Sequence, residues 1–268
     1  MIATSSGIPR PSADDVAEAI GAGEIVPWYQ PIVDLTTAQV VGVEALARWV
    51  RPSADVEPTA AFVAAVENSD LIVDLDRTIM RQAVADLGRW QADRPDLRLS
   101  LNLSGRQVDR DDWLATLEEA TGTAGVPPDR VVLELTETVR PARQDAGVGL
   151  LRQARAAGFG IWLDDFGTGW ASLYDLVNLP ATGLKIDQCF ARDLGVPAVD
   201  AVVRAMAGAA AELGLDLVIE GIAADQQARH AYGLGCRSAQ GFLWSPAVPA
   251  AALPGLLAGW PTRDPALS

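Results

Sequence analysis

The stretch from residue 130 to residue 164 reads RVVLELTETVRPARQDAGVGLLRQARAAGFGIWLD. Its two ends, residues 130–136 and 160–164, are short apolar runs rich in β-branched side chains, which predict strands. Between them, Asp145–Ala157 is rich in alanine and carries apolar residues at helical spacing, which predicts a helix. A strand, a helix and a second strand in this order are typical of a parallel sheet covered by helices.

The same alternation continues on both sides of this stretch. Strand-like runs occur at residues 28–35, 40–47, 97–104, 183–187, 215–220 and 238–243. Further segments with helical periodicity are Asp76–Ala92, Ala198–Leu213 and Ala224–Tyr232. Eight strands in a chain of 268 residues favour closure into a barrel over an open sheet.

The link between the first two strand segments makes this barrel irregular. It consists only of Thr36–Gln39, which is too short for a crossover helix, so these two strands should be antiparallel. We therefore expect an α/β fold: a modified (β/α)8 TIM-type barrel with one antiparallel strand near the N-terminus. Residues 1–15 and 261–268 are expected to be loose ends, and residues 16–260 to form the barrel domain.

The composition restricts the classes of function. Hydrophobic residues make up 49% of the chain and its net charge is −14, which is typical of a globular protein that does not bind duplex nucleic acid. The chain has no apolar run of the ~18 residues that span a bilayer, and its N-terminus lacks the apolar core of a signal peptide. We therefore expect a cytoplasmic protein without a membrane partner. Cys189 and Cys236 fit no metal motif and are expected to be buried thiols.

Polar residues interrupt the apolar strands near their C-terminal ends. They are Glu44, Asn102, Glu134, Asp164 with Asp165, Lys185, Glu220 and Gln240. In a barrel these ends meet on one face, where carboxylates repel one another unless cations neutralise them. A metal site follows, and because His230 is the only histidine, oxygen ligands and Mg²⁺, Mn²⁺ or Ca²⁺ are favoured over zinc. The alternative is a ring of helix caps and salt bridges at the rim.

Two of these positions leave their own alternatives open. Asp164 and Asp165 begin the run Asp-Asp-Phe-Gly-Thr-Gly, and adjacent side chains at a strand end should point in different directions. Each could then address a separate metal, or one of them could bridge both metals, unless the run is only a turn. Lys185 either reaches the rim or points into the site, where it could orient an attacking water. Without histidine in these motifs, the expected nucleophile is a metal-activated water.

Taken together, these motifs resemble those of the EAL family of cyclic di-GMP phosphodiesterases over Tyr29–Pro246. The signature is Glu44-Ala45-Leu46 followed by Arg48. The other motifs are Gln30 in YQPIVDL, Asn102-Leu103-Ser104, Glu134-Leu135-Thr136-Glu137, the DDFGTG loop at 164–169, Leu184-Lys185-Ile186-Asp187, Glu220-Gly221 and Gln240-Gly241.

The resemblance implies that the chain hydrolyses cyclic di-GMP to linear pGpG with two Mg²⁺ or Mn²⁺ ions, as a bacterial signalling enzyme. The implied metal ligands are Glu44, Asn102, Glu134, Asp164, Asp165 and Glu220. The implied catalytic residues are Lys185, Glu220 and Glu137, the last of which anchors the DDFGTG loop. The implied substrate-binding residues are Gln30, Glu44, Leu46, Arg48, Asn102, Asp187 and Gln240.

The resemblance also implies a homodimer. The segment after the DDFGTG loop begins with Trp170 and carries Tyr174 on the same helical face. This face is expected near a two-fold dimer interface. The alternative is that it packs on the barrel of its own chain.

One position departs from the family pattern. The family usually reads Ala-Glu-Gly-Val-Glu where this chain has Ile219-Glu220-Gly221-Ile222-Ala223, so Ala223 replaces a glutamate that supports the metal-bound waters. Two other hypotheses therefore stand beside an active phosphodiesterase: a weak or silent EAL domain that acts as a cyclic di-GMP receptor, and a protein-interaction module that keeps only the barrel. The retained cluster of charged ligands favours the active enzyme, because burying such charges is costly without metal.

Overall fold

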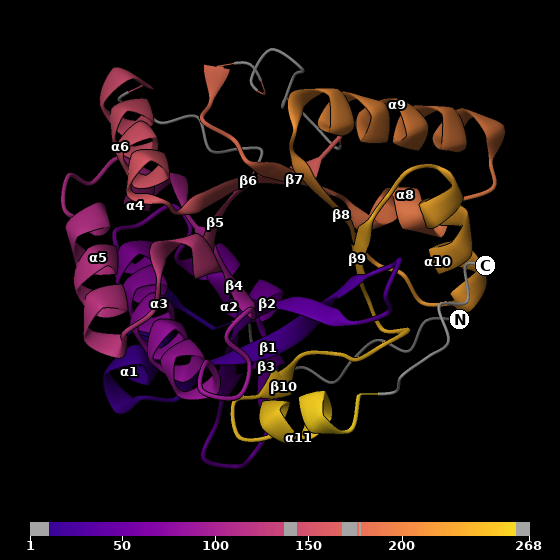
Figure 1. Cartoon of the computed structure of the whole chain (residues 1–268). Coiled ribbons are helices and arrows are strands. Elements are labelled where there is room, and N and C mark those ends of the chain that lie inside the picture. Colours follow the sequence, from indigo (N-terminus) through magenta and orange to yellow (C-terminus); the bar gives the residue numbers. More distant parts are fainter. Residues whose placement is uncertain (1–10, 137–143, 168–175, 177, 261–268) are drawn as a thin grey trace.

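A closed barrel of eight strands, surrounded by helices, forms the centre of the structure (Figure 1). The structure is a computed structural model, and it describes residues 11–136, 144–167, 176 and 178–260. The strands follow one another around the barrel in the order β1-β9-β8-β7-β6-β5-β4-β2, and β2 pairs with β1 to close it. The expected α/β barrel is confirmed.

The barrel strands match the eight expected segments, with small shifts of their ends. They are β1 (Ile25–Asp34), β2 (Val40–Val50), β4 (Arg98–Leu103), β5 (Val131–Thr136), β6 (Gly160–Phe166), β7 (Gly183–Ile186), β8 (Asp216–Ile219) and β9 (Ser238–Gln240). Two short strands that the sequence analysis missed extend the sheet outside the barrel. They are β3 (Val56–Pro58), which pairs with β2, and β10 (Val248–Pro249), which pairs with β1.

β1 is the reversed strand of the barrel. It is antiparallel to β2, where Gln30 lies opposite Glu44, and also to β9, whereas the other barrel strands pair in parallel. A tight turn follows β1, in which Asp34 Oδ1 accepts hydrogen bonds from the amides of Thr36 and Thr37 at 2.8 and 2.7 Å. The antiparallel pair expected from the short link is confirmed.

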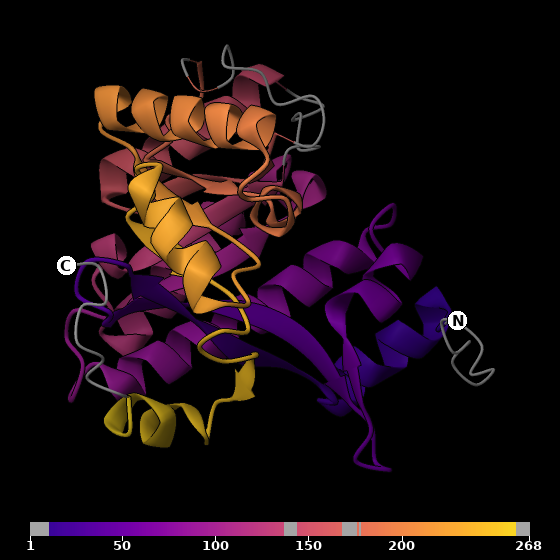
Figure 2. The same cartoon turned by 90° about the vertical axis from the view of Figure 1, so that its right-hand side faces the viewer.

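Helices cover the outside of the barrel (Figures 1 and 2). The described helices are α1 (Ala13–Ala22), α2 (Thr59–Phe62), α3 (Leu71–Trp90), α4 (Gly105–Val108), α5 (Trp113–Ala124), α6 (Gln144–Ala157), α8 (Gln188–Arg192), α9 (Pro197–Leu213), α10 (Asp225–Gly233) and α11 (Leu253–Ala258), with 3₁₀ turns η1 (Val63–Ala65) and η2 (Pro128–Arg130). The expected helices correspond to α3, α6, α9 and α10. Within the described ranges, no helix has both the length and the apolar character needed to cross a membrane.

Helix α1 begins closer to the N-terminus than the expected domain boundary. Ser12 caps it, and the Asp15 carboxylate accepts a hydrogen bond from the Ser12 amide at 2.8 Å, which completes a capping box. The helix therefore starts three residues before residue 16. Residues 1–10 and 261–268 lie outside the described residues, and the limits of the domain remain a prediction.

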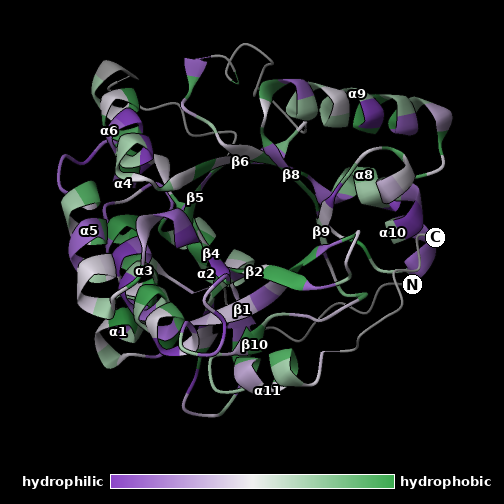
Figure 3. Ribbon diagram, viewed as in Figure 1, coloured by the Kyte–Doolittle hydropathy of each residue, from purple (hydrophilic) through white to green (hydrophobic). Residues whose placement is uncertain are grey.

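Apolar side chains fill two separate spaces on the two faces of the sheet. The larger core lies between strands and helices, and Leu133, Ile161 and Leu184 contribute to it from neighbouring strands. The helices of this layer carry hydrophobic as well as hydrophilic residues (Figure 3). A smaller cluster contains Ile32, Val132, Trp162 and Val218, and we call these four residues the barrel floor.

Gly183 makes room for the barrel floor. A Cβ atom at this position would lie 2.4 Å from Trp162 Nε1, which is far inside van der Waals contact. The indole of Trp162 can therefore occupy the inside of the barrel only because β7 begins with glycine.

Candidate active site

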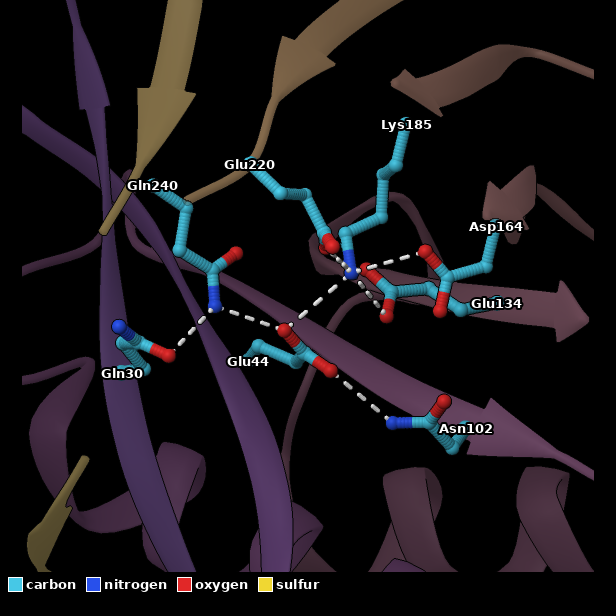
Figure 4. Close-up of polar contacts among 8 residues, drawn as sticks. All are labelled: Gln30, Glu44, Asn102, Glu134, Asp164, Lys185, Glu220 and Gln240. Carbon is cyan, nitrogen blue, oxygen red and sulfur yellow. Dashed lines mark hydrogen bonds and ion pairs between the residues drawn. The ribbon is translucent and has the colours of Figure 1, made fainter. Parts of the chain in front are cut away.

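Eight polar side chains form a layer next to the barrel floor (Figure 4). Side chains two positions apart in a strand share one face, so Glu134 follows Val132 and Asp164 follows Trp162 into the barrel. The layer consists of Gln30, Glu44, Asn102, Glu134, Asp164, Lys185, Glu220 and Gln240. The structure thus brings the polar residues at the strand ends together on one face, as the sequence predicts.

Lys185 is fully buried at the centre of this layer. Its Nζ lies 3.2 Å from Glu44 Oε2, 3.0 Å from Glu134 Oε2, 3.2 Å from Asp164 Oδ1 and 2.5 Å from Glu220 Oε1. Of the two orientations that the sequence left open, the side chain has the one that points into the site. An ammonium has only three N–H donors. At least one of its four carboxylate contacts is therefore an electrostatic attraction without a hydrogen bond.

Glu44 connects the ammonium to three side-chain amides. Its Oε1 accepts a hydrogen bond from Asn102 at 3.1 Å, and its Oε2 accepts one from Gln240 at 2.7 Å. Gln240 Nε2 also donates to Gln30 Oε1 at 3.1 Å, and Gln30 Nε2 donates to the carbonyl of Ser245 at 3.2 Å. This chain of contacts fixes the orientation of Glu44 from both sides. No sequence signal points to Ser245, because only its backbone takes part.

The carboxylates of the layer are not balanced by one ammonium. Burial raises the pKa of Glu134 well above its usual value, and the neighbouring carboxylates add to this effect. Burial also raises the pKa of Glu220 to about 8. Burial also acts to raise the pKa of Glu44. The charge of Lys185 and the hydrogen bonds from the side-chain amides outweigh burial, so the pKa of Glu44 is lowered. For Lys185, burial opposes the charged form, but its four carboxylate neighbours raise its pKa well above the usual value.

Asp164 and Asp165 both turn toward the site. The pairing of β6 with β7 shifts register between Leu163 and Phe166, and Asp165 has a left-handed backbone with φ of 52°. Ligand oxygens of Asp164, Asp165 and Glu220 therefore lie within 4.8 Å of one another. Both aspartates thus contribute an oxygen to one group of possible ligands. Burial and the Asp164 carboxylate raise the pKa of Asp165 to about 6.

The oxygen atoms of this layer suit a divalent cation. In the described part of the chain, Asp164, Asp165 and Glu220 form a group that could hold a metal ion. In addition, Glu134 Oε1 is buried without a hydrogen-bond partner, and a cation would satisfy it. Carboxylate and amide oxygens without histidine or cysteine are the ligands of hard cations such as Mg²⁺ and Mn²⁺.

Leu46 and Arg48 continue from Glu44 along the same face of β2. Both are partly buried. Arg48 Nη1 donates to the carbonyl of Ala47 at 2.8 Å and to Thr59 Oγ1 at 3.1 Å. The guanidinium is therefore held by α2 next to the carboxylate layer, in a position where other donors of its fork are available to an anion.

Asp187 lies at the start of α8, directly after β7. Its Oδ1 accepts a hydrogen bond from the Cys189 amide at 2.8 Å, so it caps this helix. Its carboxylate also interacts with that of Asp165. Asp187 thus connects the metal-binding group to α8. Cys189 itself is only partly buried, which corrects the expectation of two buried thiols, whereas Cys236 is buried as expected.

Gln227 holds the turn that follows Glu220. Its Oε1 accepts hydrogen bonds from the amides of Ala223 and Ala224 at 2.8 and 3.0 Å, and its Nε2 donates to the carbonyl of Ala191 at 2.9 Å. Ala223 is exposed. Gln227 lies three residues after Ala224, the residue that precedes α10, and the sequence gives only half of a capping-box signal there, because alanine has no side-chain oxygen.

Several predicted residues cannot be placed. Glu137, Thr168 and Gly169 lie outside the described residues, as does the segment from Trp170 to Tyr174. Their proposed roles therefore rest on the resemblance of the sequence motifs alone.

Comparisons with known proteins match the chain to one protein family. The model of the EAL domain family matches residues 13–247. Cyclic di-GMP phosphodiesterase PA2567 from Pseudomonas aeruginosa is 37% identical over 216 residues, which cover 80% of this chain and 37% of that protein. The chain spans about a third of the length of the curated relatives that it matches first, with 33–37% covered.

Solved structures share the fold. The PaMucR phosphodiesterase in complex with c-di-GMP superposes with a TM-score of 0.83 at 33% identity, covering 90% of this chain and 98% of that one. Klebsiella pneumoniae BlrP1, in a manganese and cyclic di-GMP complex, superposes with a TM-score of 0.74 at 27% identity, covering 84% of this chain and 56% of that one.

Proposed function

The chain belongs to the EAL domain family, and on this basis we propose that it hydrolyses cyclic di-GMP to linear pGpG with divalent metal ions. The observation that carries the proposal is the layer inside the barrel, where Glu44, Glu134, Asp164 and Glu220 surround one ammonium. A receptor that only binds a nucleotide does not need this density of buried negative charge.

The charge of the site supports two divalent ions. Five carboxylates, from Glu44, Glu134, Asp164, Asp165 and Glu220, face one ammonium, which leaves four negative charges when all of them are ionised. Two Mg²⁺ or Mn²⁺ ions balance this charge. We propose that one ion is bound by Glu44, Asn102, Glu134 and Asp164, and the other by Asp164, Asp165 and Glu220.

The metal ions would supply an activated water and neutralise charge on the phosphate. The protein contributes the positions of the reacting groups. Asn102 and Gln240 fix Glu44 by hydrogen bonds at 3.1 and 2.7 Å. Lys185 brings its ammonium close to the carboxylates, so that it can donate a hydrogen bond to the attacking water and orient it. Glu220 would help to hold that water, and Glu137 would anchor the DDFGTG loop.

The proposed substrate contacts lie on the adjacent strands. Gln30 and Gln240 carry amides that can bind the dinucleotide beside the ions, and Arg48 supplies a guanidinium that can pair with a phosphate. Leu46 offers an apolar surface on the same face of β2. Asp187, which interacts with Asp165, would connect substrate binding with the second ion.

Two further properties belong to this proposal. We propose that the protein acts as a two-fold homodimer through the region after the DDFGTG loop. We also propose that it works in the cytoplasm, which is consistent with two free cysteines, Cys189 and Cys236, among the described residues.

A cyclic di-GMP receptor is the second candidate function, because Ala223 stands where the family has a glutamate. One experiment separates the two. The protein is incubated with cyclic di-GMP and Mn²⁺ or Mg²⁺, pGpG is followed by chromatography, and binding is measured by calorimetry in parallel. We expect both binding and pGpG formation, with turnover lost in a Glu44→Gln variant. Binding without any pGpG would establish the receptor function instead.

A further inference from the structure

Lys185 is the only lysine among the 268 residues, whereas 20 arginines supply the other basic side chains. It is also among the largest side chains that are fully buried. Lysine therefore occurs in this chain at one buried position, and the other permanently charged basic side chains are arginines. A planar guanidinium with five N–H donors could not take the same place between four converging carboxylates, whereas a compact ammonium can.

The contacts of Lys185 lie on oxygens that the proposed function assigns to metal ions. Its Nζ is within 3.2 Å of carboxylate oxygens from Glu44, Glu134, Asp164 and Glu220. These residues come from four different strands or strand ends, so the ammonium joins them across the width of the barrel. Without a cation between them, buried carboxylates at this distance would repel one another.

We infer that Lys185 is a built-in counter-ion, which holds the four carboxylates together when no divalent cation is bound and which competes with the cations for the same oxygens. The inference rests on the proposed metal-dependent function and adds a second role to the contact with water. In this role Lys185 is a positioning residue. Cation binding must move its ammonium away from at least some of the four carboxylates.

Two consequences distinguish this role from one in catalysis alone. Replacing Lys185 by methionine, which has a similar length but no charge, removes the counter-ion. The variant should be less stable than the natural protein in chelator, because four buried carboxylates lose their partner. It should also bind Mn²⁺ more tightly, because no ammonium repels the ion. A residue that only fills space would not raise the affinity for Mn²⁺ when it is removed, and a residue that only orients water would not stabilise the metal-free protein.

The first experiment measures Mn²⁺ affinity by calorimetry for the natural protein and for Lys185→Met. We expect the variant to bind at least tenfold more tightly, and its midpoint of thermal unfolding to rise more on addition of Mn²⁺ than that of the natural protein. Arg98→Met is the matched control. It removes one positive charge at the other end of the barrel, where Arg98 pairs with Asp216 at 2.8 Å, and should change the affinity less than twofold. Equal or weaker binding by Lys185→Met would overturn the inference.

The second experiment uses the natural protein and does not depend on whether the variant folds. Because the chain has one lysine, protein labelled with ¹³C-lysine gives a single Cε signal in an NMR spectrum. We expect this signal to shift as Mg²⁺ is added, in proportion to the bound Mg²⁺ measured by calorimetry. If Mg²⁺ binds and pGpG forms while the signal stays unchanged, the inference is wrong and the proposed function stands. If neither Mg²⁺ nor Mn²⁺ binds, the proposed function itself fails.

Discussion

At the scale of single residues, Ala223 lies at the end of the turn that leads from Glu220 to α10. Its side chain is exposed, and its amide is held by Gln227 at 2.8 Å. The backbone of this turn is therefore fixed, and a longer side chain at position 223 has free space. The turn also requires Gly221, which has φ of 73° and no room for a Cβ atom beside Gln188.

This position gives the first prediction. Ala223→Glu should raise kcat by about tenfold with little change in substrate binding, because a group that positions the reacting water acts mainly in the transition state. The value corresponds to about 1.4 kcal/mol for one positioning contact. Steady-state kinetics at saturating Mg²⁺ measure it. Ala224→Glu is the matched control, since Ala224 is also exposed and bonded to Gln227, and it should leave kcat unchanged. Equal rates for Ala223→Glu and the natural protein would mean that the substitution is neutral.

Residues of the site differ in how well the sequence predicts them. Glu134 and Asp164 could be predicted because each follows an apolar residue at a spacing of two in a strand, so its direction is fixed. The direction of the Asp165 side chain could not be predicted, because it depends on a register shift between β6 and β7. The contact between Gln30 and Ser245 joins positions 215 residues apart, and no local pattern indicates it.

At the scale of elements, the start of β7 decides how the barrel is filled. A Gly183→Ala substitution would place a Cβ atom 2.4 Å from Trp162 Nε1. We expect it to lower the free energy of unfolding by about 1–3 kcal/mol, as overpacking in a core does, and to weaken cation binding because Lys185 lies two residues further on. Urea unfolding and Mn²⁺ calorimetry check both effects.

Two variants serve as controls for this prediction. Gly208→Ala in α9 adds a Cβ atom with nothing within 4 Å, so it should be neutral or slightly stabilising. Trp162→Leu should relieve the clash, so the double variant with Gly183→Ala should be more stable than the sum of the two single changes indicates. Strict additivity would show that the two side chains do not compete for the same space.

Helix α3 is connected to the end of β4 through Asp76. The carboxylate accepts a hydrogen bond from the Ser104 amide at 3.1 Å, two residues after Asn102. Burial raises the pKa of Asp76 to about 7, although hydrogen bonds from Ser104 oppose the shift. In the folded protein the carboxyl thus keeps its proton to a higher pH than in the unfolded chain, so stability falls as the pH rises from about 4 to about 7.

This linkage is tested with Asp76→Asn, which keeps an oxygen acceptor for the Ser104 amide but does not titrate. Between pH 4 and pH 7 the natural protein should lose about 2–4 kcal/mol of stability relative to the variant. Free energies of unfolding from urea titrations at several pH values measure the difference. Asp74→Asn changes an exposed position of the same helix. The free energy of unfolding of this variant should change with pH as that of the natural protein does. If the free energy of unfolding of Asp76→Asn also followed that of the natural protein between pH 4 and pH 7, the raised pKa of Asp76 would be contradicted.

The elements themselves could be predicted where their pattern is strong. The eight strands and α3, α6, α9 and α10 follow from period-two and helical spacing. Helix α5 was missed although Trp113, Leu114, Leu117 and Thr121 are buried along one face, because its remaining residues give a weak amphipathic pattern. The strands β3 and β10 have three and two residues, too few for any periodicity.

At the scale of the whole molecule, the family resemblance predicts a dimer. Light scattering of the protein at micromolar concentration, with Mg²⁺ and cyclic di-GMP present, should give twice the mass of one 28.3 kDa chain. A mass of one chain under these conditions would contradict the two-fold assembly. Because the segment from Trp170 to Tyr174 lies outside the described residues, this prediction depends on the sequence alone.

The central claim is that the carboxylate layer acts through divalent cations, and the rate of pGpG formation from cyclic di-GMP tests it most directly. Protein freed of metal by exhaustive chelation should form no pGpG, and addition of Mn²⁺ or Mg²⁺ should restore turnover. Ca²⁺ should bind without supporting the reaction, because it is larger and a poorer Lewis acid. Undiminished formation of pGpG after chelation would contradict the account.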